Sequence, residues 1–188
     1  MAVATTAAEP AHVERDWLAI KRFGLWLFFL SESLVFGLLL ASRFFIEGIH
    51  REHLDQNLGL AITSILLVSS ITAFWAEGSI ANGNKKGFVW GLALTIVMGT
   101  VFAVGVGYEW SIAEFSRTES FGTVFFAMTG VHAAHVISGV IMLIILLVLG
   151  IKGRYTAESH WPVAAVVMYW HFVDVVWVFF YPALYLVD

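Results

Sequence analysis

The sequence predicts an all-α fold, an integral membrane bundle of five transmembrane helices. Apolar residues make up 60% of the 188 residues and charged residues only 13%, and the mean hydropathy is +0.84. This composition is typical of membrane proteins. About 20 apolar residues are needed to cross a bilayer, and five stretches of the chain are that long. They cover residues 23–46, 58–81, 88–106, 121–149 and 163–186.

The segments between these stretches are short and leave no room for a second domain. Residues 1–10 are small and polar and lack the apolar core of a signal peptide, and residues 1–22 are predicted to form a cytoplasmic N-terminal tail. Residues 23–188 then form one transmembrane domain. A polar turn around Asn82, Gly83 and Asn84 joins the second and third stretches. Tryptophans near the ends of the stretches fit the aromatic belt of a membrane surface: Trp17, Trp26, Trp75, Trp90, Trp110 and Trp161.

Lysine and arginine are distributed unevenly between the two sides of the predicted bundle. With the N-terminus inside, the inner segments hold seven of these residues and the outer segments hold three. Short cytoplasmic loops carry the excess of positive charge in membrane proteins, so we expect the N-terminus to be cytoplasmic and the C-terminus to lie outside. The inner residues are Arg15, Lys21, Arg22, Lys85, Lys86, Lys152 and Arg154, and the outer residues are Arg43, Arg51 and Arg117.

Five ionisable residues lie within the apolar stretches. Glu32 is in the first, His132 and His135 are in the fourth, and His171 and Asp174 are in the fifth. At 1.5 Å per residue, all five fall near the middle third of a hydrocarbon core roughly 30 Å thick. Ionisable groups at this depth are costly unless they face a partner, so they mark function or assembly by default.

The spacing of these residues indicates how they can meet. The two histidines of the fourth stretch are three residues apart, as are His171 and Asp174, so each pair shares one helix face. The fourth and fifth stretches are joined by a short loop and are expected to be antiparallel neighbours. The five groups can therefore converge between three helices, and a histidine such as His132, or Asp174, is a candidate partner for Glu32.

Three interpretations of this polar set stay open. Imidazole and carboxylate bind iron, copper and zinc, but the spacing matches no metal motif. The chain has no cysteine, which excludes disulfides, thiolate metal sites and iron–sulfur clusters. Glu and His at mid-depth are also expected in a proton path. Finally, the groups can bond across helices and fix their register, at about 0.6 kcal/mol per contact. The residues alone favour this structural interpretation, followed by the proton path.

Small and hydroxyl-bearing residues fit ordinary helix packing. Gly99, Ala103 and Gly107 recur every four residues in the third stretch, a pattern that lets backbones approach closely. Packing within one subunit is favoured over a dimerisation face. Five hydroxyl side chains can bond to the backbone of their own helix, and no further role is assigned to them: Ser31, Ser33, Ser69, Ser70 and Thr72.

Five motifs resemble those of a known family, and they follow one another in the same order. Residues 169–177 read Tyr-Trp-His-Phe-Val-Asp-Val-Val-Trp, and residues 130–136 read Gly-Val-His-Ala-Ala-His-Val. Residues 24–33 read Gly-Leu-Trp-Leu-Phe-Phe-Leu-Ser-Glu-Ser, and shorter motifs lie at 66–72 and 105–110. In these segments the chain resembles subunit III of the haem–copper terminal oxidases, and Glu32 matches that family's buried glutamate.

The chain differs from some members of this family in its number of helices. Mitochondrial-type relatives have seven helices, and this chain begins at what would be their third, so it resembles the five-helix bacterial type. In the longer relatives lipids occupy a cleft between the first two helices and the rest. A lipid site of that shape would need a wall from another subunit here.

The resemblance implies a non-catalytic subunit of an aerobic respiratory oxidase, which reduces O2 to water and pumps protons. In the family this subunit supports proton uptake into subunit I and protects it from inactivation. No cofactor is expected in this chain: haem and copper belong to partner subunits, and phospholipid is the one ligand that the resemblance allows. Expected partners are the haem-bearing subunit I, a copper- or quinol-associated subunit II and membrane lipids, without nucleic acid. The expected location is the inner membrane of a bacterium.

Other functions stay open at this point. Quinol oxidases and an accessory subunit of nitric oxide reductase carry similar five-helix chains, so the electron donor is not determined. An independent proton channel or transporter would use Glu32 and the histidines. A small b-type cytochrome would hold haem between histidines such as His135 and His171.

Overall fold

In the computed structural model, residues 16–47 and 54–187 are described, and within these ranges the chain forms five long helices and no strands. All five helices are long and apolar enough to cross a bilayer, so the predicted fold class is confirmed. The helices are α1 (Trp17–Glu47), α2 (Gln56–Ala81), α3 (Lys85–Ile112), α4 (Ser120–Ile151) and α5 (Trp161–Tyr185).

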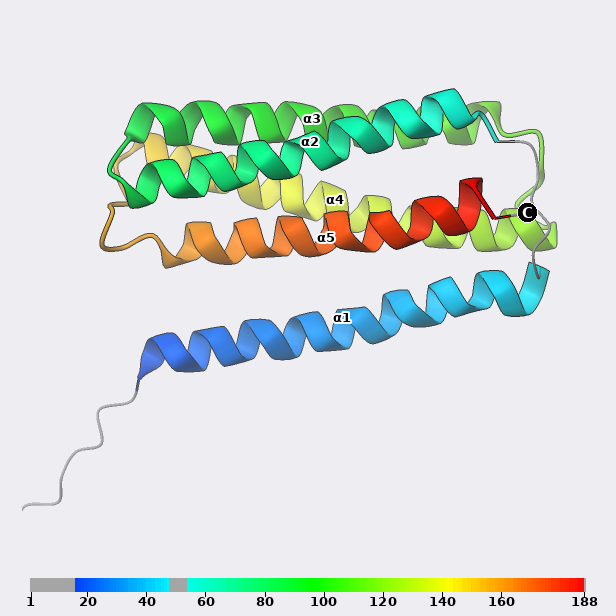
Figure 1. Cartoon of the computed structure of the whole chain (residues 1–188), viewed down its shortest axis with the longest axis horizontal. Helices are drawn as coiled ribbons and strands as arrows, with labels where there is room; N and C mark the ends of the chain where they lie inside the picture. The colour runs from blue at the N-terminus through cyan, green and yellow to red at the C-terminus, as the bar shows by residue number, and fades with distance from the viewer. Residues whose placement is uncertain (1–15, 48–53, 188) are drawn as a thin grey trace, which may run out of the picture.

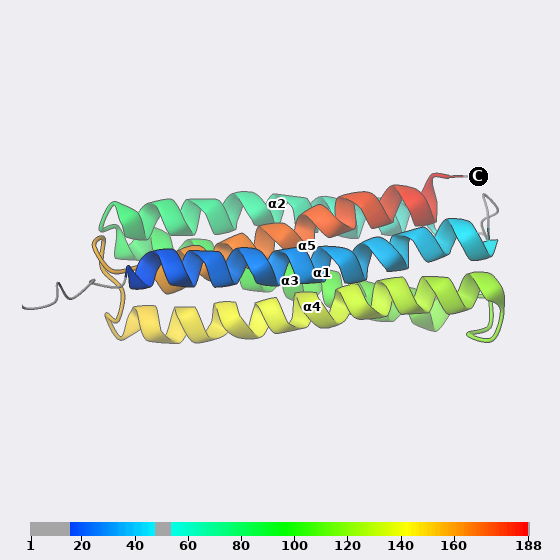
Figure 2. The same cartoon turned by 90° about the horizontal axis from the view of Figure 1, so that it is seen from below.

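The helices run side by side along one long axis, and α1 begins at the opposite end of the bundle from the end of α5 (Figure 1). Helices α2, α3, α4 and α5 form a closely packed group. Helix α1 lies outside this group and contacts α4 and α5. Helix α5 therefore lies between α1 on one side and α2 on the other (Figure 2).

The helices extend beyond several of the predicted stretches. Helix α1 begins at Trp17 and not at residue 23, and α3 ends at Ile112 and not at residue 106. Hydropathy marks the hydrocarbon core, whereas the backbone stays helical into the membrane surface. Residues 17–22 of the predicted tail therefore belong to α1, and residues 1–15 lie outside the described ranges.

Side-chain caps set the starts of three helices. The Asp16 carboxylate accepts hydrogen bonds from the backbone of α1 residues Leu18 and Ala19, each 3.0 Å long. Asp55 caps α2 in the same way, and Asn84 accepts from the backbone N–H of Gly87 at the start of α3. Such caps satisfy the free N–H groups of the first turn, so these polar residues define the helix starts more sharply than hydropathy does.

Close packing centres on the ring of Trp170 in α5, which is fully buried. A side chain at Gly99 of α3 or at Gly139 of α4 would collide with this ring. The prediction that the small residues of the third stretch serve packing within the subunit therefore holds at Gly99. By contrast, an added Cβ at Gly107 would have no atom within 4 Å.

Arg43, which the sequence assigned to the outer side, is a fully buried residue of α1. Its Nε donates a hydrogen bond to the backbone carbonyl of Ala183, 3.2 Å away, near the end of α5. Its guanidinium also lies 5.3 Å from the centre of the Phe121 ring. Arg43 thus joins the last turns of α1 and α5.

Candidate functional site

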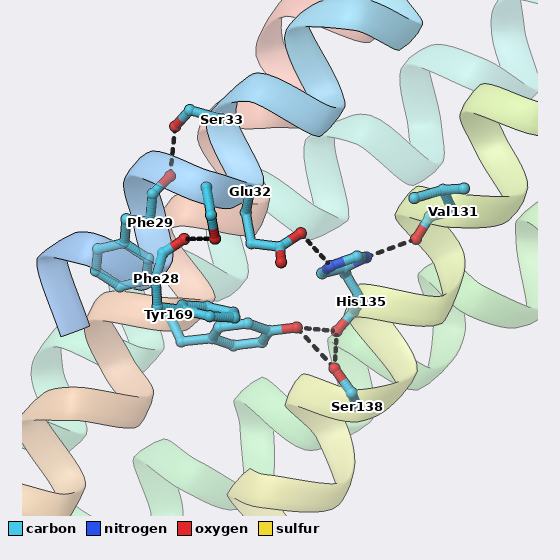
Figure 3. A network of polar contacts seen from close by, with 9 residues as sticks. Phe28, Phe29, Glu32, Ser33, Val131, His135, Ser138 and Tyr169 are labelled. Atoms are coloured by element: carbon cyan, nitrogen blue, oxygen red, sulfur yellow. Dashed lines mark hydrogen bonds and ion pairs between the residues drawn. The ribbon is translucent and has the colours of Figure 1, made fainter. Parts of the chain in front are cut away.

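The contact between Glu32 of α1 and His135 of α4 joins the outlying helix to the rest of the bundle (Figure 3). Glu32 Oε2 lies 3.3 Å from His135 Nε2. About a fifth of each side chain is exposed, 22% for Glu32 and 21% for His135. The pair is therefore shielded by protein but open at its edge.

The second ring nitrogen of His135 determines the proton arrangement of this pair. His135 Nδ1 lies 2.8 Å from the backbone carbonyl of Val131, and a carbonyl only accepts, so Nδ1 carries a proton. Nε2 then either accepts from a protonated Glu32 or, as part of an imidazolium, donates to the carboxylate. In both cases one proton lies between the two residues and the pair has no net charge, which hydrocarbon tolerates best.

Hydroxyl groups and rings hold His135 in place. Ser138 Oγ donates to the His135 carbonyl at 2.8 Å and lies 2.7 Å from the Tyr169 hydroxyl. The Tyr169 hydroxyl also donates to the same carbonyl at 3.2 Å (Figure 3). The ring of Phe36 meets the imidazole edge-on, with centres 4.8 Å apart. Residues from α1, α4 and α5 therefore position this imidazole.

A second polar group joins α2 to α5. Ser70 Oγ lies 3.0 Å from His171 Nδ1 and is also hydrogen-bonded to Asp174 Oδ2. Asp174 is buried, and its Oδ1 has no hydrogen-bond partner among the described residues. One serine hydroxyl therefore connects the two ionisable groups of α5.

His132 forms a third, separate contact. It is fully buried, and its Nε2 lies 3.1 Å from the backbone carbonyl of Val173 in α5. Its ring packs between Trp177 and Phe102, with ring centres 4.7 Å and 5.6 Å away. Nδ1 has no hydrogen-bond partner in the described part of the chain.

The five predicted residues thus form three separate contacts and do not converge at one site. The partner of Glu32 is a histidine, as expected, but it is His135 and neither His132 nor Asp174. A spacing of three residues turns the side chain by about 60° around the helix. That turn is enough for His132 to face α5 while His135 faces α1. Within the described ranges, no three His, Asp or Glu side chains are placed to share a metal ion.

Hydroxyl groups that the sequence gave no role make several contacts between helices. Ser70 bridges α2 to α5, Ser69 Oγ accepts from Trp170 Nε1 at 2.9 Å, and the hydroxyls of Thr72 and Thr95 are 2.7 Å apart. Ser31, Ser33, Ser69 and Thr72 do bond to the backbone of their own helix, as predicted, and Ser69 and Thr72 bridge helices as well. Helical spacing is the signal that marks the bridging hydroxyls, since they lie on the face that packs against a neighbour.

Comparison with known proteins gives the chain a family. A family model for cytochrome c oxidase subunit III matches residues 11–188. The cytochrome c oxidase subunit 3 of Coturnix japonica is 42% identical over 124 residues, which are 65% of this chain and 48% of the relative. That of Pelomedusa subrufa is 40% identical over the same share. This chain thus spans about half the length of these relatives.

A shorter relative covers nearly the whole chain. The cytochrome c oxidase subunit 3 of Thermostichus vulcanus is 33% identical over 193 aligned positions, which include 96% of this chain and 92% of the relative. The family match extends over all five helices and over every residue of the three polar contacts. This chain belongs to the cytochrome c oxidase subunit III family.

Proposed function

We propose that this chain is a non-catalytic subunit of a haem–copper terminal oxidase that reduces O2 to water and pumps protons. Family membership supports this class of complex. Haem and copper belong to partner subunits I and II, and subunit II determines the electron donor. The role of this chain is to sustain proton uptake into subunit I and to protect that subunit during turnover. The observation that carries this role is the Glu32–His135 contact.

The geometry of that contact suits proton handling without catalysis. One proton between Glu32 Oε2 and His135 Nε2 can shift from one residue to the other while the pair stays neutral. The partly exposed edge of the pair lets a group of a neighbouring subunit exchange that proton. This chain therefore offers a mid-membrane proton site beside a catalytic partner.

An independent proton channel is the second candidate, and the polar contacts favour it less. A channel needs a continuous chain of donors and acceptors across the membrane. Among the described residues, the Glu32–His135 contact, the Ser70 group and the His132 contact share no hydrogen bond. The supporting role requires only the first of these contacts.

The experiment uses Glu32→Gln in the assembled oxidase. Glutamine keeps the size of the side chain and bonds to His135, so we expect the complex to assemble. It cannot release a proton, so proton release per O2 or the working life of the enzyme should fall by several-fold, and the initial rate of O2 consumption should fall less. O2 consumption, proton release and activity decay are measured on one preparation.

A matched acid-to-amide control is Glu119→Gln, which changes an exposed carboxylate with no side-chain cap bond at the start of α4. This variant should behave as the unchanged chain in all three measurements. Immediate loss of all O2 reduction in a fully assembled Glu32→Gln complex would place Glu32 in the chemistry itself. The supporting role would then be wrong.

The proposal includes the inner membrane of a bacterium, with the N-terminus of the chain in the cytoplasm. The burial of Arg43 inside the bundle supports this orientation, because it removes one of the three positive charges from the outer loops. Reporter fusions after residue 188 and within residues 152–159 should report opposite sides of the membrane. Reports from the same side would overturn the orientation.

A further inference from the structure

Helix α5 is open to the membrane along the face between α1 and α2. Helix α1 contacts only α4 and α5 among the described helices, and a cavity lined by α1, α2 and α5 lies between α1 and α2. We call the face of α5 between α1 and α2 the α1–α2 groove. On α5 it carries Met168, His171 and Val175, which are half-buried or exposed. Gly37 of α1 borders it beside Val175, and Phe74 of α2 lies one turn from Ser70, which contacts His171.

Two cavities lie along this groove. One, of about 470 Å³, is lined by Arg22 and Trp26 of α1, Glu77 of α2, and Trp161 and Met168 of α5. The other, of about 290 Å³, is almost entirely apolar and lies between α1 and α5 beside Phe36, Gly37 and Val175. A Cβ added to Gly37 would meet no atom within 4 Å. The groove therefore has room for a closely packed occupant.

His171 is the polar exception at mid-depth in this groove. It lies ten residues after the start of α5 at Trp161, which is about 15 Å along the helix. Val175, one turn further along α5, is 54% exposed, and Phe74, one turn along α2 from Ser70, is 68% exposed. The imidazole is half-buried, with Nδ1 turned inward to Ser70. Nε2 has no hydrogen-bond partner among the described residues and is not one of the fully buried unpartnered atoms.

The hydrogen bonds on the inner side determine what Nε2 offers. The single hydroxyl proton of Ser70 connects His171 Nδ1 and Asp174 Oδ2. If Asp174 is ionised, Ser70 donates to it and accepts from Nδ1–H, and neutrality then requires an imidazolium with a second proton on Nε2. If Asp174 Oδ2 is protonated, it donates to Ser70, Ser70 donates to Nδ1, and the neutral ring again carries its proton on Nε2.

A third neutral arrangement would protonate Asp174 on Oδ1. That oxygen is buried and has no partner within the described residues, so the hydroxyl would be an unpaired buried donor, which is unfavourable. In the first two arrangements the group is neutral and every buried donor has an acceptor, and in both of them His171 Nε2 carries a proton. His171 presents an N–H donor to the groove.

An N–H group that faces hydrocarbon needs an acceptor, and neither water nor lipid headgroups supply one at mid-depth. The occupant must then be protein. We propose that the α1–α2 groove holds a transmembrane helix of another oxidase subunit, with a backbone, hydroxyl or carboxylate oxygen that accepts from His171 Nε2–H. This inference rests on the proposed function, because it requires the assembled oxidase.

The test combines cross-linking with subunit retention in the oxidase purified from native membranes. A photo-cross-linking amino acid at position 74 or 175 should form an adduct with one other subunit. His171→Leu should abolish that adduct and reduce the amount of the partner retained in detergent by several-fold. His171→Gln, whose amide also donates, should retain both. Val97→Leu, an apolar change at an exposed position of α3 outside the groove, is the control and should retain both.

Three results would overturn the inference while leaving the proposed function intact. They are adducts with lipid alone, adducts with a second copy of this chain, and equal partner retention by His171→Leu and Val97→Leu. Failure of the unchanged chain to co-purify with any haem-bearing subunit would instead overturn the proposed function, and the inference with it.

Discussion

Helix α1 and helix α5 differ in how they are held, although both cross the bundle at full length. In the most apolar stretch of α1 only 11% of the residues are buried, against 56% in α5. The buried residues among those described in α1 are Phe29, Phe36 and Arg43, which are spaced seven residues apart. Helix α1 thus contacts the bundle along one narrow seam, whereas α5 is surrounded.

Close packing of large buried side chains holds α5 in place. The buried ring of Trp170 packs against Gly99 of α3 and Gly139 of α4, and its Nε1 donates to Ser69 of α2. Trp177 repeats this arrangement two turns later, with Nε1 donating to Thr63 of α2 and its ring edge-on to Phe102 of α3. Two side chains of α5 therefore fix the positions of three other helices.

A polar contact holds the seam of α1. Leu25, Phe29, Phe36 and Leu39 pack against the bundle, and with Glu32 between Phe29 and Phe36 the spacings along this seam alternate between four and three residues. One polar residue in an apolar seam fixes register at some cost in stability. Helix α5 is therefore positioned by packing, whereas the register of α1 depends on Glu32 and His135.

The largest effect is expected from Trp170→Ala in α5. This change removes the ring that three helices enclose and leaves a cavity, which should lower the free energy of unfolding by about 3–5 kcal/mol. The measurement is denaturant-induced loss of helicity in detergent, followed by circular dichroism. Trp170→Phe should cost less, because it keeps most of the ring and loses only the hydrogen bond to Ser69.

The matched control for this prediction is Trp90→Ala in α3, where the tryptophan is 66% exposed. Its removal should change the free energy of unfolding by less than about 1 kcal/mol. Equal destabilisation by Trp170→Ala and Trp90→Ala would show that packing around α5 does not hold the bundle together, and the comparison with α1 would fail.

The sequence predicted the helices well because hydrocarbon imposes length and composition on every span. It missed the starts of α1 and α3, because the signal there is a single capping residue outside the apolar stretch, Asp16 or Asn84. The domain limits at residues 1–22 and 23–188 stay predictions, since most of the tail lies outside the described residues.

The polar residues were less predictable than the helices. Depth along the apolar stretches predicts that Glu32 and His135 lie near the middle of the membrane, but spacing cannot say which neighbouring helix each face meets. The pairing of Glu32 with His135 and not with His132 depends on the position of α4 between α1 and α5. Ser70 was missed for the same reason, because a serine that bridges helices has the same local sequence as one that bonds to its own turn.

A double-mutant cycle on Glu32 and His135 tests how α1 is held. The expected change in stability is smaller than that for Trp170→Ala. Each single change to leucine leaves the other polar group without its partner at mid-depth, so each should weaken the seam of α1. The double change to leucine makes the seam apolar and removes both unpaired groups. The double change should therefore weaken the seam of α1 by less than the sum of the two single changes. The expected coupling energy is about 0.6 kcal/mol and at most about 1.7 kcal/mol.

The release of α1 can be measured directly because the chain has no cysteine. A cysteine at position 25, which packs against the bundle, would be the sole thiol, and its labelling rate in detergent reports how often the seam opens. The cycle of Ser31→Ala with His135→Leu is the control, since Ser31 is exposed and bonds only to its own helix. In this control the effects of the two changes should be additive.

Additivity in the Glu32–His135 cycle as well would mean that apolar contacts such as the stacked rings of Phe29 and Phe172, 5.1 Å apart, set the position of α1. The two helices would then be held by the same means.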